Sequence, residues 1–482
     1  MKRREFLKTV GAAAGGAFAV SSKAHGGKRP SENAPNILLI MTDQQFADAM
    51  SCGVGRQFIH TPHMDGLAER GTLFSRAYCP NPLCKPSRAS MFTGRYAHET
   101  GIQSNSSLRR QGKKKLDATE FPCIGTILKN AGYDTGYVGK WHLPFHKNET
   151  SAHGFDYRAK LHNEGHDSEL PGPAGEFIQK DRDRPFFLVT SFCNPHNICE
   201  WSRGQTLPDG PIGDAPPPAE CPPLLPNHMP PENETDIISI MRKGYHKHRL
   251  FPVGDYSLGK WRQYRWAYYR LIEKVDALIG RVLRTLKQSG QEDNTVIVFA
   301  ADHGECHGAH KWNQKTVFYD ESARVPLIIS GRGTKQGRIS DRLTQTGVDL
   351  FPTLCEYAGI EPPSRLPGRS LKGLAEGRTP AEWRSHLVSS NRMIQCEPVD
   401  GKRYEPDGRM VRSERYKYCL YSLGKDRESL VDMKKDPGEM VNLTGNSEFG
   451  ETVKQHRARL REHARKHGDT LALKMLAAVE NS

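Results

Sequence analysis

The sequence contains no run of about 20 apolar residues, the length that a membrane-spanning helix needs. It has eleven cysteines but no C-x-x-C pair, so a zinc ribbon or a thioredoxin-like site is not expected. It also lacks a zinc knuckle, a helix-turn-helix signature, a basic-aromatic stripe and internal repeats. We therefore expect neither a membrane domain nor a nucleic-acid partner.

The composition is that of a soluble globular enzyme, with 36% hydrophobic and 26% charged residues in a chain of 482. This length is too great for one small core, and it predicts a large α/β domain with a smaller companion. The formal net charge is +14. Without residues 1–24 it would be about +10, a balance that favours anionic polymers as partners.

The first 24 residues have the pattern of an export signal. Arg3-Arg4 is followed by Phe6-Leu7-Lys8 and then by a weakly apolar, Gly/Ala-rich run over 9–22. This pattern resembles a bacterial twin-arginine (Tat) signal peptide. Small residues at Ser22 and Ala24 predict cleavage near Ala24, and the mature protein would then be periplasmic or secreted. The alternative is a basic N-terminus without a targeting role.

Short apolar runs alternate with helix-like segments along much of the chain. Such an alternation predicts a mainly parallel sheet with helices on both faces. The expected strands cover residues 36–41, 134–138, 185–191, 295–300 and 325–330. The expected helices cover residues 64–70, 124–131, 261–287 and 348–358.

Two shifts in composition divide the chain. Residues 202–260 carry proline clusters and little periodicity, which predicts a long surface insertion near the substrate opening. A second shift follows Gly368–Leu371, after which 409–423 predicts a hairpin and 451–479 a basic terminal helix. We therefore expect a catalytic domain over 33–375, with the insertion inside it, and a smaller α+β C-terminal domain over 376–482.

Two polar groups directly follow predicted strands. Asp43-Gln44 comes after the first strand, and Asp302-His303-Gly304-Glu305 comes after strand 295–300. Ligands of open α/β sheets bind outside the carboxyl ends of the strands. Two carboxylates, an amide oxygen and an imidazole are enough to hold one divalent ion. Either pair alone would be weak evidence, because an aspartate at a strand end is often a helix cap.

The sharpest pattern is Cys84-Lys85-Pro86-Ser87-Arg88, followed by Thr93-Gly94-Arg95. Cys-x-Pro-Ser-Arg resembles the formylglycine signature of the type I sulfatases, in the alkaline phosphatase superfamily. In that family a formylglycine-generating maturation enzyme oxidises the cysteine to an aldehyde, whose hydrate supplies the attacking oxygen. A thiolate would leave a stable adduct, whereas a gem-diol keeps a second hydroxyl that can expel sulfate. The alternative is a buried structural cysteine.

The resemblance extends over nearly all of the chain beyond the signal and implies an alkaline-phosphatase-like α/β sandwich. The matching blocks are Gly132–Leu143, His153–Asp156, Pro185–Phe187 with Pro195-His196, Asp302–Pro326, Val348–Leu354 and Asp432–Leu443. Carried over by position, the metal ligands would be Asp43, Gln44, Asp302 and His303. Arg88 would pair with residue 84 and with the carboxylates of the metal site.

The remaining roles implied by the resemblance concern the sulfate and the leaving group. Lys140 would hold a sulfate oxygen, and His142 would contact the diol and take its proton when sulfate leaves. His196 and Lys315 would flank the ester oxygen, so that one of them protonates the leaving alcohol. His310 would be a substrate contact.

Three positions depart from the common family pattern. Gln44 and His303 stand where aspartate and asparagine are usual, and Pro144 replaces a glycine. The neutral ligands lower the negative charge of the site, and an imidazole widens the choice of metal from Ca²⁺ to Mn²⁺ or another divalent ion. The Gln/His pair is similar to that of phosphonate monoester hydrolases and choline sulfatases of the same superfamily.

We therefore predict an exported sulfatase that hydrolyses sulfate monoesters, with a sulfated sugar or polysaccharide as substrate. Two alternatives stay open at this point. One is a phosphonate monoester or phosphodiester hydrolase that uses the same diol. The other is a non-catalytic carbohydrate-binding relative, against which the complete set of Cys84, Arg88, Lys140, His142 and Asp302 argues.

Overall fold

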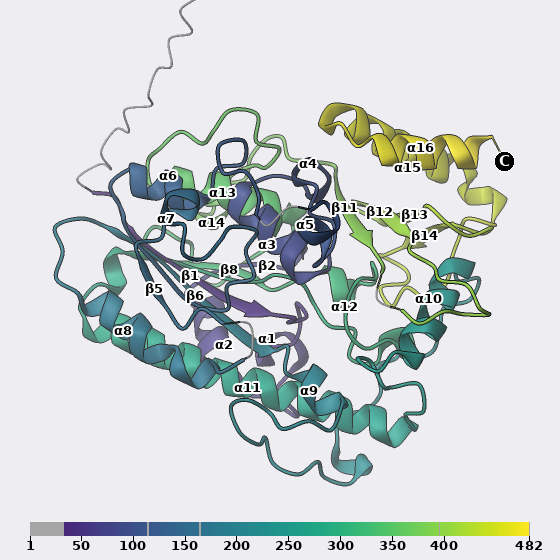
Figure 1. Cartoon of the computed structure of the whole chain (residues 1–482), viewed down its shortest axis with the longest axis horizontal. Coiled ribbons are helices and arrows are strands. Elements are labelled where there is room, and N and C mark those ends of the chain that lie inside the picture. Colours follow the sequence, from purple (N-terminus) through teal and green to yellow (C-terminus); the bar gives the residue numbers. More distant parts are fainter. Residues whose placement is uncertain (1–32, 113–114, 163–164, 395, 482) are drawn as a thin grey trace, which may run out of the picture.

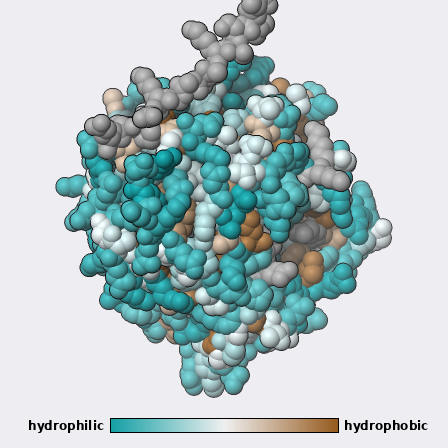
Figure 2. Space-filling view, turned by 60° about the vertical axis from the view of Figure 1, so that its left-hand side comes forward, coloured by the Kyte–Doolittle hydropathy of each residue, from teal (hydrophilic) through white to brown (hydrophobic). Residues whose placement is uncertain are grey.

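The computed structural model describes residues 33–112, 115–162, 165–394 and 396–481. The predicted signal peptide lies outside these residues. Among the helices that the structure describes, none is both long enough and apolar enough to cross a membrane. The face drawn in Figure 2 is mainly hydrophilic, and its hydrophobic residues gather in small areas.

An eight-stranded sheet forms the centre of the molecule, in the order β5-β4-β6-β1-β7-β8-β2-β9 (Figure 1). Its strands are β1 (Asn36–Asp43), β2 (Gly71–Phe74), β4 (Asp134–Gly139), β5 (Tyr157–Ala159), β6 (Phe186–Pro195), β7 (Thr295–Ala301), β8 (Leu327–Gly331) and β9 (Arg338–Ser340). All neighbouring pairs are parallel except β7 with β8 and β2 with β8. The predicted mixed fold with a mostly parallel sheet is therefore confirmed.

Helices cover both faces of this sheet (Figure 1). On one face lie α2 (Pro62–Glu69), α8 (Pro171–Gln179) and α11 (Leu258–Gln288), and on the other α3 (Cys84–Thr93), α6 (Ile124–Asn130) and α13 (Thr346–Tyr357). Both faces of the central strand β1 are buried, because its successive apolar side chains point in turn into the two cores. Leu38 and Ile40 enter one core, while Leu39 and Met41 enter the other.

A second, four-stranded antiparallel sheet follows in the order β11-β12-β13-β14. Its strands are β11 (His386–Arg392), β12 (Asp407–Ser413), β13 (Tyr416–Tyr421) and β14 (Glu428–Asp432). The helices α15 (Gly450–His467) and α16 (Thr470–Glu480) share one hydrophobic core with this sheet. The predicted hairpin over 409–423 corresponds to β12 and β13, and the predicted smaller α+β region is present.

Several segments differ from the expectations. The single terminal helix predicted over 451–479 is wrong, because Gly468 adopts a left-handed φ of 71° and separates α15 from α16. The strand expected over 325–330 runs antiparallel to its neighbour β7. The proline-rich insertion contains a helix, α10 (Asp236–Lys247), which shares a core with the second sheet.

Short elements complete the chain. They are α1 (Ser51–Val54), α4 (Ala97–Thr100), α5 (Ser107–Arg110), α7 (Thr150–His153), α9 (Ile198–Ser202), α12 (Asp320–Ala323), α14 (Lys372–Ala375), β3 (Ala77–Tyr78) and β10 (Thr344–Gln345). Of these, α4, α5 and α12 lie in Figure 1 between the large sheet and the second sheet.

Candidate active site

The site begins at the carboxyl ends of two neighbouring parallel strands. Asp43 is the last residue of β1, and Asp302-His303 directly follows β7. The register pairs Thr42 with Ala301, so the two polar segments leave the sheet side by side. All three side chains are fully buried. Placement beyond adjacent strand ends is where an α/β sheet positions its ligands.

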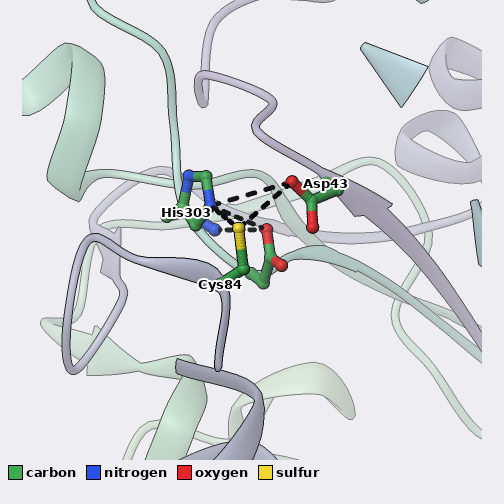
Figure 3. A group of neighbouring side chains, drawn as sticks. Asp43, Cys84 and His303 are labelled. Carbon is green, nitrogen blue, oxygen red and sulfur yellow. Dashed lines mark hydrogen bonds and ion pairs between the residues drawn. The ribbon is translucent and has the colours of Figure 1, made fainter. Parts of the chain in front are cut away.

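Cys84 brings the start of α3 to the same point. Its Sγ lies 3.1 Å from Nε2 of His303 and 3.6 Å from Oδ1 of Asp43. Figure 3 shows these three side chains pointing toward one another. Ligand atoms of Asp43, Cys84, Asp302 and His303 all lie within 4.8 Å of each other. The structure therefore brings the predicted nucleophile together with three of the four predicted metal ligands.

Gln44 adopts a left-handed φ of 70°, which is uncommon for a residue other than glycine. Its backbone N–H donates to Oδ1 of Asp302 at 3.2 Å. Its side-chain Nε2 donates to Oε2 of Glu305 at 2.5 Å, and its Oε1 accepts a hydrogen bond from Nζ of Lys315. Because the amide nitrogen is held by Glu305, the amide oxygen faces Lys315 on the Cys84 side.

Glu305 is a residue of the site to which the sequence analysis gave no role. It is fully buried and accepts hydrogen bonds from Gln44, from the Tyr264 hydroxyl at 2.8 Å, from the Gln314 N–H at 2.6 Å and from the His307 N–H at 3.2 Å. Its place in the Asp302–Glu305 run is the only sequence signal for it. The Glu305 carboxylate determines which end of the Gln44 amide faces the site.

Two buried cations hold the carboxylates in place. Arg88 donates from Nε to Oδ2 of Asp302 at 2.6 Å and from Nη2 to Oδ2 of Asp43 at 3.1 Å. Lys140 lies 2.8 Å from Oδ2 of Asp43. Arg88 also donates to Oγ of Ser191 at 2.9 Å, which fixes the guanidinium against β6. The cations thus bind both carboxylates through Oδ2, whereas Oδ1 of Asp302 accepts the backbone N–H of Gln44 and of His303, and Oδ1 of Asp43 faces the Cys84 thiol.

His303 presents a lone pair to this centre. Its Nδ1 lies 2.9 Å from the carbonyl oxygen of Gly304, which can only accept, so Nδ1 carries the proton. Burial lowers the pKa of His303 to about 4, with Lys315 adding to the effect, so the ring is neutral. Nε2 lies 3.6 Å from Asp302 and 3.8 Å from Asp43, outside hydrogen-bond distance.

Electron-pair donors therefore point at one another. Oδ1 of Asp43, Oδ1 of Asp302 and Nε2 of His303 converge beside the Cys84 thiol, and the amide oxygen of Gln44 lies on the same side, where it accepts from Lys315. Such a donor set, with two carboxylates and neutral N and O ligands, fits a divalent cation. The sequence predicts the same four side chains as metal ligands, and that assignment stays a prediction.

Positive charge surrounds residue 84. Burial and Asp43 raise the pKa of the Cys84 thiol, but Lys315, Lys140 and a hydrogen bond with His142 outweigh them and lower it to about 7. Nζ of Lys315 lies 3.2 Å from Sγ. The side chains predicted to act on sulfate thus favour an anion at this position.

His196 belongs to the same group. Burial, Lys140 and Lys315 hold the pKa of His196 well below its usual range, and Asp43 is also close enough to affect it. Lys85, His142 and His196 are the partly exposed residues of this region, whereas Cys84, Lys140 and Lys315 are buried. Substrate would therefore enter past Lys85, His142 and His196.

His310 lies elsewhere. Its buried ring stacks on Tyr319 with a centroid distance of 3.8 Å, and its Nε2 lies 3.3 Å from Nδ2 of Asn227. These contacts connect the insertion with α12 and do not include Cys84 or its neighbours. The predicted role of His310 as a substrate contact stays a prediction.

Comparisons with known proteins identify the family of the chain. The family model Sulfatase matches residues 35–360, and the model N-sulphoglucosamine sulphohydrolase, C-terminal, matches residues 308–466. A Delta 4,5-hexuronate-2-O-sulfatase of Bacteroides thetaiotaomicron is 30% identical, over 92% of each chain.

Solved structures give the same result. A 2-O GAG sulfatase superposes with a TM-score of 0.78 at 30% identity and covers 90% of this chain and 93% of its own. A structure in complex with D-glucosamine-2-N,6-O-disulfate has a TM-score of 0.74 at 26% identity, over 90% and 98%. The chain therefore belongs to the sulfatase family, within the alkaline phosphatase superfamily, and is a sulfuric ester hydrolase.

Proposed function

We propose that this sulfatase removes sulfate from sulfated carbohydrate, with a formylglycine made from Cys84 as its nucleophile. The observation that carries the proposal is the position of Cys84, whose Sγ lies 3.1 Å from His303, 3.2 Å from Lys315 and 3.6 Å from Asp43. Relatives named for hexuronate and N-acetylglucosamine sulfates support a sugar as the alcohol.

An aldehyde hydrate at position 84 would supply one hydroxyl to attack sulfur and a second to release sulfate afterwards. The chain itself would handle the protons. His142, which is hydrogen-bonded to Cys84, would take the proton of the second hydroxyl. His196 and Lys315 would flank the ester oxygen, and one of them would protonate the leaving alcohol.

Binding of the sulfate group would use the buried cations. Burial acts against the charge of Lys140, but Asp43 outweighs it and raises the Lys140 pKa, so the ammonium stays charged. A divalent cation held by Asp43, Gln44, Asp302 and His303 would neutralise charge on the sulfate ester. We propose Ca²⁺, with Mn²⁺ as the alternative because an imidazole is an uncommon ligand for so hard an ion as Ca²⁺.

The test of the function is a direct comparison of esters. Purified enzyme with formylglycine at position 84, shown by a peptide about 18 Da lighter than the thiol form, should hydrolyse nitrophenyl sulfate faster than phenylphosphonate. A higher rate on phenylphosphonate would favour the phosphonate hydrolase. Binding of sulfated sugar without turnover of either ester would favour the non-catalytic relative.

Metal identity needs its own titration. Chelated enzyme should regain turnover with Ca²⁺ when Ca²⁺, Mg²⁺, Mn²⁺ and Zn²⁺ are added separately. Recovery with Mn²⁺ alone would change the ion, and full activity in metal-free buffer would overturn the ligand assignment.

We further propose export by the twin-arginine route to the periplasm or beyond, on the strength of Arg3-Arg4 and the short apolar run after it. Replacement of both arginines by lysine keeps the charge and tests recognition alone. The double variant should accumulate as cytoplasmic precursor, and normal periplasmic accumulation would rule this route out.

A further inference from the structure

A hollow of about 430 Å³ lies between the segment 101–111 and the end of β11. It is lined by Gly101 and by five polar side chains, Gln103, Ser104, Ser107, Gln111 and Arg392. In Figure 1, α5 and β11 lie next to each other beside α3, which carries Cys84 at its start. None of the lining residues has a role in the site described above.

Hydrogen bonds connect both walls of the hollow to the residues beside the nucleophile. On one wall, the side chain of Asn105 accepts from the backbone N–H of Lys85 at 3.1 Å. On the other, Nδ2 of Asn391 donates to the carbonyl oxygen of Thr316 at 2.5 Å. Asn105 follows the lining residue Ser104, and Asn391 precedes Arg392. The hollow therefore flanks the side of the site that carries Cys84 and Lys315.

Two polar atoms at this hollow are buried without a hydrogen-bond partner among the described residues. They are Nε of Arg392, a donor, and Oε1 of Gln103, an acceptor. Buried polar groups in folded proteins almost always have a partner, so each unpaired one needs an explanation. A ligand with both hydroxyl donors and hydroxyl acceptors would satisfy both atoms.

The charge of the hollow points to neutral groups. Nη2 of Arg392 lies 3.6 Å from Glu405, and Nη1 lies 3.9 Å from Asp407. Two carboxylates thus already offset its single positive charge, while neither distance is short enough for a hydrogen bond. Arg392 is therefore suited to donate a hydrogen bond to a hydroxyl oxygen more than to attract a further anionic substituent.

We propose that this hollow binds the hydroxyl groups of the sugar from which sulfate is removed, and that Arg392 and Gln103 form hydrogen bonds with those hydroxyls. The inference rests on the proposed function, since it names the part of the enzyme that recognises the alcohol. On the proposed function the sulfate group would be held by Lys140 and the metal ligands, none of which lines the hollow. The hollow thus determines which sugar is cleaved and leaves sulfate chemistry unchanged.

The experiment separates the sugar from the sulfate. Arg392→Met and Gln103→Leu are assayed on nitrophenyl sulfate and on the best saccharide from a panel of sulfated glucosamine, galactosamine and hexuronate derivatives. For each variant kcat/KM on the saccharide should fall about tenfold, mainly through KM, while turnover of nitrophenyl sulfate stays unchanged. Arg461→Met, which removes a similarly exposed arginine of α15, should leave both rates unchanged.

The nature of the contact is tested by Arg392→Gln and Arg392→Lys. Gln keeps N–H donors without charge, so Arg392→Gln should recover most of the rate on the saccharide. Recovery by Arg392→Lys alone would show that the sugar is bound through the positive charge and would overturn the hydroxyl assignment. Equal losses on both substrates, no loss on the saccharide, or a parent enzyme that cleaves nitrophenyl sulfate but none of the saccharides would overturn the proposal. A parent enzyme inactive on nitrophenyl sulfate and on every saccharide of the panel would instead contradict the proposed function.

Discussion

Two of the clusters of buried charge among the described residues are built in opposite ways. In the Lys417 cluster (Lys417, Asp320 and Glu439), Nζ lies 2.5 Å from Asp320, 2.8 Å from Glu439 and 2.9 Å from the Phe318 carbonyl oxygen, so all three ammonium hydrogens have acceptors. Around Cys84, by contrast, oxygen and nitrogen lone pairs of Asp43, Asp302 and His303 face one another.

The difference separates a cluster that connects two parts of the fold from a cluster that forms a binding site. In the Lys417 cluster each charge meets an opposite charge, and the contacts join α12 to β13 of the second sheet. In the Cys84 group the cations Arg88 and Lys140 bind the outer carboxylate oxygens, whereas the inner oxygens and Nε2 of His303 converge beside the Cys84 thiol. Satisfied clusters stabilise a fold, whereas clusters with convergent lone pairs indicate a ligand.

The largest effect is expected at the nucleophile. Cys84→Ala should lower turnover at least about a thousandfold, because the group that attacks sulfur is removed. The protein should stay folded, with little change in melting temperature. Cys355→Ala, which removes a buried thiol in α13, is the matched control and should keep its turnover. An active Cys84→Ala enzyme would contradict the mechanism.

In the Lys417 cluster the opposite pattern is expected. Lys417→Met leaves the buried Glu439 carboxyl without its cation and Asp320 with only Arg324, and should lower the free energy of unfolding by about 3 kcal/mol. Near 25 °C the remaining folded enzyme should keep its turnover. The exposed Lys434→Met serves as control, with denaturant unfolding as the measurement. A loss of turnover without a loss of stability would mean that the two clusters do not differ in the way described.

A smaller effect is expected at Glu305, which acts through Gln44. Glu305→Gln should weaken metal binding about 10- to 100-fold, because the Gln44 amide is no longer held with its oxygen on the Cys84 side. Titration of the chelated variant with metal should shift to higher concentration, and excess metal should restore part of the activity. Glu321→Gln changes a buried glutamate bonded to Asn227 and should leave the titration unshifted.

The smallest effect is a pH dependence of stability in the Lys417 cluster. Burial and Asp320 raise the pKa of Glu439 to about 8, with Lys417 offsetting only part of the increase. The folded state therefore holds this proton more tightly than the unfolded state, and stability from this group is lost as pH rises from about 4.5 to 8. Glu439→Gln should reduce the difference in melting temperature between pH 5 and pH 8 by about 2 °C. An unchanged difference, as expected for the exposed Glu451→Gln, would contradict this assignment.

Much of the fold could be predicted because buried parallel strands are continuous apolar runs, and because their carboxyl ends mark the site. Asp43 and Asp302 were found in this way. Strand direction could not be predicted from the sequence, because the apolar run of β8 is the same whether the strand pairs parallel or antiparallel. The break after His467 could have been predicted, because Gly468 is a helix stop and Asp469 caps the next helix through the Ala472 N–H.

Glu305 shows what the sequence cannot give. Its partner Gln44 lies 261 positions away, and only the folded chain brings the two together. The orientation of the Gln44 amide depends on that contact and on Lys315, so the residue type alone identifies a possible ligand but not which atom it offers. The hollow beside Arg392 likewise depends on two segments that are far apart in the chain.

The burial of Cys84 has a consequence for how active enzyme is made. Only 2% of this residue is exposed, and it lies against side chains from three other parts of the chain. A maturation enzyme could reach the thiol only before those parts close over it, so modification and folding compete in time. On the proposed mechanism, a chain that folds before its Cys84 is modified stays inactive. The active fraction of any preparation would then equal the fraction of chains that were modified before they folded. Later addition of metal or oxidant would not change it.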